Sequence, residues 1–112
     1  DLYMKGFYPF IDARNGGSID GVIYFLTKVI EEINQDTLVI PGHGPISNYD
    51  GLADYVLMLK KVRDRITRMI KAGSSLEDVL SAGITAEWDD GLGDNTQFIN
   101  RAFMSLTHRI VE

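Results

Sequence analysis

The sequence predicts an α/β protein that is rich in helices and has one or two short strands. Several segments repeat apolar residues at helical spacing, and each could bury one face of a helix. One short run, Thr37-Leu38-Val39-Ile40, stops at Pro41-Gly42 and indicates a buried strand. Residues 1–4 predict a second, partial strand. This is too little β structure to cover the apolar faces of the helices.

The first helix is predicted to begin after the segment Asn15-Gly16-Gly17-Ser18. Ser18 suits the N-cap, and Asp20 in the first turn complements the helix dipole. The helix is expected to end near Asn34. Its apolar stripe consists of Ile19, Val22, Ile23, Leu26, Val29, Ile30 and Ile33.

The longest predicted helix follows the strand and the segment that contains His43. Asn48 or Asp50 can cap its start, and Gly73 suits a left-handed stop. One face of this helix gathers the apolar residues Leu52, Val56, Leu59, Val62, Ile66, Met69 and Ile70. The basic residues within 60–68 lie on other faces, and we interpret them as a solvated surface.

Two further helices are predicted toward the end of the chain. Ser74 and Glu77 have the spacing of a capping box and open a short helix that ends near Gly83. Residues 84–93 are predicted to form a loop, and residues 94–97 to cap the final helix. The final helix is expected to turn Phe98, Ala102, Phe103, Leu106 and Ile110 inward. We interpret His108 in this helix as a surface residue or a dipole partner.

Composition narrows the classes of function. The 112 residues fit one domain, and 45% apolar with 24% charged residues is typical of a globular protein. The formal charge of -5 argues against nucleic acid and anionic membranes as partners. The absence of cysteine excludes disulfides and thiolate metal sites, and is compatible with the cytoplasm, where we place the chain. No apolar run reaches the roughly 18 residues of a membrane span.

The segment Pro41-Gly42-His43-Gly44-Pro45 carries the clearest chemical signal. A strand that ends there would deliver one histidine to its C-terminal edge, where α/β sheets place their ligand sites. Flanking glycines let the backbone turn sharply and approach a ligand closely. Imidazole is the commonest metal ligand in proteins, so His43 is a candidate ligand. The alternative is a loop histidine that makes a backbone hydrogen bond.

Four segments resemble the C-terminal half of metallo-β-lactamase-superfamily hydrolases. They are Asp1-Leu2-Tyr3, Tyr8-Pro9-Phe10-Ile11-Asp12, Asn15-Gly16-Gly17-Ser18-Ile19-Asp20-Gly21 and Thr37-Leu38-Val39-Ile40-Pro41-Gly42-His43-Gly44-Pro45. The resemblance continues loosely to Trp88 and so covers essentially the whole chain. It implies that residues 1–112 are one partial domain, the C-terminal half of an αββα sandwich.

The resemblance also implies a metal site. The family binds one or two divalent metals, usually Zn2+, and His43 matches its last histidine ligand. Asp1 matches the bridging aspartate, although the glycine that precedes it in the family is not in this sequence. In such a site, metal-activated water attacks an ester, thioester or lactam-type bond.

The sequence departs from the family in its main metal motif. His-x-His-x-Asp-His is absent, and the only histidines are His43 and His108. A catalytic zinc site needs three protein ligands and an open position, so this chain is expected to be inactive alone. No catalytic or cofactor-binding residue can be assigned, and the substrate is not encoded in any motif. Because Asp1 stands where a methionine would open a gene product, we expect a processed start or a piece of a longer protein.

Two functions follow from this departure. The first is the C-terminal part of a metal-dependent hydrolase that a missing N-terminal half completes. The alternative is a non-enzymatic, self-associating remnant of that fold that acts as a binding or structural module. Its apolar helix faces would then be covered by a second copy of the chain, in a homodimer or larger homo-oligomer.

Overall fold

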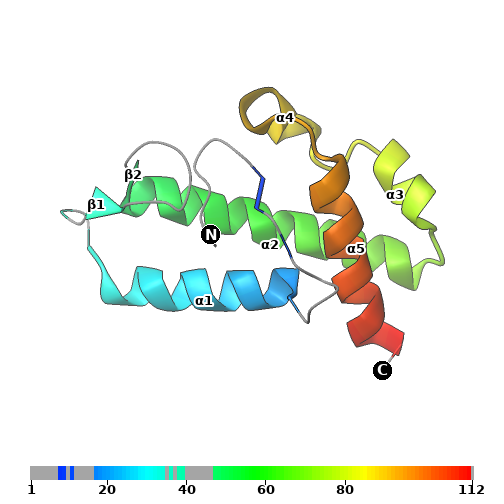
Figure 1. Cartoon of the computed structure of the whole chain (residues 1–112), viewed down its shortest axis with the longest axis horizontal. Helices are drawn as coiled ribbons and strands as arrows, with labels where there is room; N and C mark the ends of the chain where they lie inside the picture. Colours follow the sequence, from blue (N-terminus) through cyan, green and yellow to red (C-terminus); the bar gives the residue numbers. More distant parts are fainter. Residues whose placement is uncertain are drawn as a thin grey trace.

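The computed structural model describes residues 8–9, 11, 17–34, 36, 38–39 and 47–111, and leaves out the side chains of 38–39, 47 and 108–111. Its helices are α1 (Ile19–Glu32), α2 (Tyr49–Lys71), α3 (Leu76–Ser81), α4 (Ala86–Leu92) and α5 (Thr96–Val111). Two short strands, β1 (Leu38–Val39) and β2 (Ser47–Asn48), lie between α1 and α2 and pair in an antiparallel manner. In Figure 1, α1 lies alongside α2, while α5 crosses α2 steeply.

The predicted α/β class is wrong, and so is the predicted half of an αββα sandwich. In the described part of the chain, β structure is limited to the two-residue pair β1–β2, and the domain is helical. A pair this short offers no sheet face on which helices can pack. The apolar faces of α1, α2 and α5 therefore pack on one another instead.

The core is centred on α2, which contacts α1, α5 and both strands. Leu59, Val62 and Ile66 are fully buried, as their spacing predicts. The stripe of α2 is wider than predicted, since Tyr55 and Met58 are also buried. From the other helices the core takes Ile19, Val22, Ile23, Leu26, Val79, Phe98, Ile99, Ala102 and Leu106.

Local signals placed the first two helices correctly. The Ser18 hydroxyl accepts a hydrogen bond from the Gly21 amide at 2.9 Å and caps α1. Asn48, one of two predicted caps, accepts from the Gly51 amide at 2.9 Å and starts α2. Gly73 follows α2 with a φ of 86°, which confirms the predicted left-handed stop.

Two predictions nearer the C-terminus are wrong. The capping box of α3 is one residue later than predicted and consists of Ser75 and Asp78, each accepting from the other's amide. These hydrogen bonds lower the pKa of Asp78 below the usual carboxyl value. The predicted loop 84–93 contains the helix α4, whose residues Trp88 and Leu92 pack against the core. That packing stabilises a short helix whose local sequence signals are weak.

Candidate functional site

The described residues that flank His43 are held together by the strand pair. Val39 of β1 lies opposite Ser47 of β2, so the described residues on either side of 40–46 are paired. β2 continues directly into α2, and both strands contact that helix. His43 and Asp1 themselves lie outside the described residues. Their assignment as metal ligands therefore stays a prediction.

The described residues do not form a metal centre of their own. Within the ranges that the structure describes, no three His, Cys, Asp or Glu residues gather in a way that could hold an ion. The side chain of His108 is not among those described, so its predicted role at the surface is untested.

A polar cluster joins Tyr8 to α4 and to the start of α5. The Asp89 Oδ1 atom accepts from the Tyr8 hydroxyl at 2.6 Å, from the Thr85 hydroxyl at 2.8 Å and from Asn95 Nδ2 at 3.0 Å. Thr85 is fully buried. The Tyr8 ring stacks on Phe98, with ring centroids 4.9 Å apart. The cluster therefore ties the segment before α1 to the last two helices.

The hydrogen bonds of this cluster shift the pKa values of the Asp89 carboxyl and the Tyr8 hydroxyl. Burial raises the pKa of Asp89, but donation by Tyr8, Thr85 and Asn95 outweighs it, and the pKa is lowered overall. Burial, followed by the hydrogen bond to Asp89, raises the pKa of the Tyr8 hydroxyl far above its usual value. A carboxylate engaged by three donors is suited to holding structure and not to transferring protons.

Trp88, which the sequence left without a role, lies beneath an arginine of α2. The Arg65 guanidinium lies 5.1 Å from the centroid of the Trp88 ring. Arg65 also donates to the Ile84 carbonyl oxygen at 2.6 Å and pairs with Glu87. These contacts dock α4 on α2. No sequence motif marked the partnership of Trp88 and Glu87 with Arg65.

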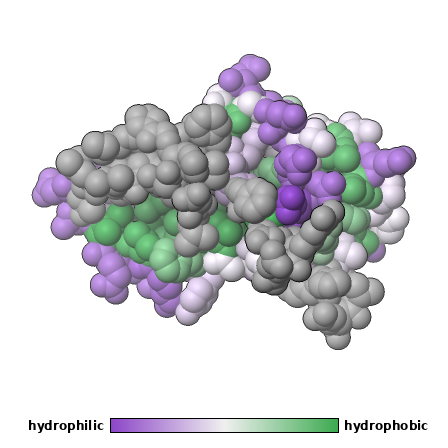
Figure 2. Space-filling model, viewed as in Figure 1, coloured by the Kyte–Doolittle hydropathy of each residue, from purple (hydrophilic) through white to green (hydrophobic). Residues whose placement is uncertain are grey.

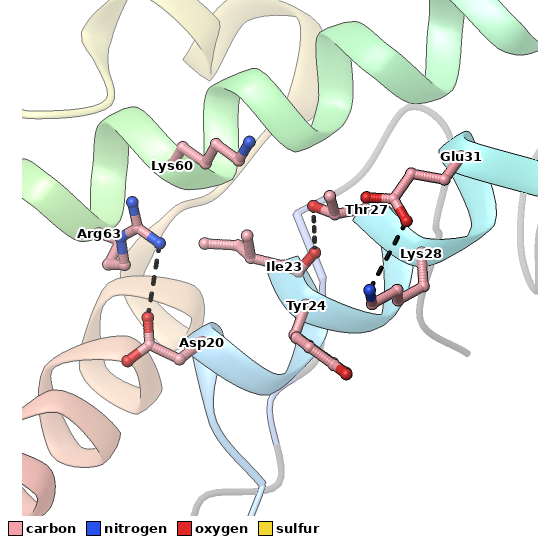
Figure 3. A pocket seen from close by; sticks show the side chains of 8 residues that line it. All are labelled: Asp20, Ile23, Tyr24, Thr27, Lys28, Glu31, Lys60 and Arg63. Carbon is pink, nitrogen blue, oxygen red and sulfur yellow. Dashed lines mark hydrogen bonds and ion pairs between the residues drawn. The ribbon is translucent and has the colours of Figure 1, made fainter.

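An open groove runs between α1 and α2, with a volume of about 560 Å³. It is lined by Asp20, Ile23, Tyr24, Thr27, Lys28, Glu31, Lys60 and Arg63. Ion pairs lie at both ends: Arg63 with Asp20 at 3.7 Å, and Lys28 with Glu31 at 3.6 Å (Figure 3). The sequence pattern did not reveal this groove, because its residues come from two helices and carry mixed charges.

None of the described helices combines the length and the apolar character that crossing a lipid bilayer requires. No protein-family model matches the chain, and no curated protein or solved structure matches it either.

Proposed function

We propose that this chain supplies His43, together with Asp1, to the metal centre of a metallo-β-lactamase-type hydrolase. In such a centre, one or two Zn2+ ions activate a water that attacks an ester, thioester or lactam-type bond. The pairing of Val39 with Ser47 supports this role, because metal ligands need segments whose ends are held by ordered structure. The proposal concerns these ligands and does not include the αββα sandwich.

The proposed centre is completed by ligands from an N-terminal half that carries His-x-His-x-Asp-His. The present chain has two histidines, fewer than such a site uses, and is inactive by itself on this proposal. We place the hydrolase in the cytoplasm, with which a chain without cysteine is compatible. Reading the gene upstream of Asp1 tests the proposal directly, and an upstream sequence without the histidine motif would contradict it.

The isolated chain should bind Zn2+ weakly, and replacing His43 by alanine should lower that affinity. Loss of a hydrogen bond that supports a metal ligand lowers the metal affinity roughly 10- to 100-fold, and loss of the ligand itself should lower it at least as much. Isothermal titration of Zn2+ into the parent chain and His43→Ala measures the difference. His108→Ala is the matched control, since it removes the other histidine and should leave the affinity unchanged. Equal affinities for the parent and His43→Ala would rule out His43 as a ligand.

A second candidate function, a self-associating module, is favoured by exposed apolar side chains. Tyr24, Phe25 and Leu57 are 66%, 52% and 51% exposed. On the face in Figure 2, hydrophobic residues gather along α1. Burying such surface stabilises an interface by about 25 cal/mol per Å². A second copy of the chain would cover it without requiring any enzymatic activity.

If the chain self-associates through α1, Phe25→Glu should shift it toward the monomer. The reason is that a carboxylate would have to be desolvated at the interface. Sedimentation velocity over a range of protein concentrations measures the distribution, with Glu32→Gln on the exposed end of α1 as the control. A parent chain that stays monomeric throughout the micromolar range would exclude this function.

A further inference from the structure

The groove between α1 and α2 has the features of a binding site that the proposed hydrolase does not use. Its volume of about 560 Å³ lies within the 300–1,000 Å³ typical of small-molecule sites. Two helices that pack directly on each other form its walls. Its accessible apolar surface comes mainly from Tyr24, which is 66% exposed and has the Lys28 ammonium 5.5 Å from its ring centroid, while Ile23 is buried beneath.

Lys60 is the cation of this groove that is available to a ligand. Arg63 pairs with Asp20, and Lys28 pairs with Glu31. Among the described residues, by contrast, Lys60 has no ion pair or hydrogen bond. In Figure 3 the Lys60 side chain lies along α2, between the two ion pairs in this view. A desolvated anion placed there would gain a charge-assisted hydrogen bond.

The surrounding charges select the kind of anion. The described lining has three cations and two carboxylates, so this part of the groove is positive although the chain as a whole carries -5. Asp20 and Glu31, one at each end, would repel a second negative charge on the ligand. Lys60 would repel a cationic ligand. A ligand with a single negative charge next to an apolar group would match both Lys60 and the apolar wall of the groove.

We propose that the α1–α2 groove binds a small aromatic monocarboxylate, with Lys60 contacting the carboxylate and Ile23 and Tyr24 contacting the ring. The described lining residues all belong to α1 and α2, so this proposal makes no use of His43. It therefore stands or falls separately from the proposed hydrolase.

The test is a titration of the whole 112-residue chain with sodium benzoate, followed by amide chemical shifts in NMR. For a ligand of this size we expect a Kd of about 1 mM and saturable shifts along residues 20–31 and 60–63. Benzyl alcohol lacks the charge and sodium acetate lacks the ring, so both should bind more weakly. Absence of saturable shifts in the groove, or acetate binding as tightly as benzoate, would overturn the proposal.

Two lysine variants decide whether Lys60 holds the anion. Lys60→Gln should raise the Kd for benzoate about three- to fivefold, the range that an exposed ion pair provides. The matched control is Lys61→Gln, since the exposed Lys61 follows on the same helix but does not line the groove. Its Kd should equal that of the parent. Equal changes in Kd for the two variants would mean that benzoate responds to the overall charge of α2 and not to a contact with Lys60, which would refute the assigned contact.

Discussion

Replacing Leu59 by alanine should lower the free energy of unfolding by about 2–5 kcal/mol, a large share of the stability of a domain this size. Leu59 is fully buried on α2, the helix that contacts α1, α5 and both strands. Truncation removes apolar contacts and leaves a cavity that rigid helix backbones cannot fill completely. Urea denaturation followed by far-UV circular dichroism measures the loss.

Leu57→Ala is the matched control for this experiment. Leu57 lies on the same helix, two residues earlier, but its side chain is 51% exposed. The same chemical change there should alter the free energy of unfolding by less than about 0.5 kcal/mol. Losses of similar size at the two positions would mean that the described packing of α2 is incorrect.

Replacing Asp89 by asparagine should destabilise the protein by about 1.5–3 kcal/mol, the usual range for hydrogen bonds to a charged group. The new amide keeps the shape of the carboxylate but turns one acceptor into a donor that faces Asn95 Nδ2. Donation by Tyr8 and Thr85 also loses its charge-assisted character. The neighbouring exposed Asp90→Asn serves as the control and should be nearly neutral.

The effect of Asp89→Asn should depend on pH in a defined direction. The folded protein lowers the pKa of Asp89, so its contribution is present above the ordinary carboxyl pKa of about 4. That contribution is lost as the pH falls through the lower, folded-state value. The stability difference between the parent and Asp89→Asn should therefore shrink below about pH 4. A difference that stays constant from neutral to acid pH would contradict the hydrogen-bonding pattern of Asp89.

The predictable parts of the fold are those that depend on a few neighbouring residues. Ser18 and Asn48 mark helix starts because each side chain accepts a hydrogen bond from a backbone amide of the first turn. Gly73 marks a helix end because it adopts a positive φ, which glycine does readily. The capping box of α3 was misplaced by one residue, since Ser74 and Ser75 both have acidic residues three positions later. Helix α4 was missed because its stability comes from the packing of Trp88 on the core and not from its own sequence.

The candidate sites were less predictable than the helices. The sequence pointed to His43 through a local motif, and the described structure adds the pairing of Val39 with Ser47 on either side of it. The α1–α2 groove left no signal in the pattern, because Lys60 and Ile23 are far apart in the chain and share no motif.

The sequence by itself determined the starts of α1 and α2, the stop of α2 at Gly73, much of the apolar stripe of these two helices and the motif around His43. These follow from hydrogen bonds and periodicities that span a few residues. Only the tertiary structure decided that the helix stripes cover one another and that Tyr8 meets Asp89, 81 positions away. An apolar stripe states that a face must be buried but not against what, since the hydrophobic effect has no direction.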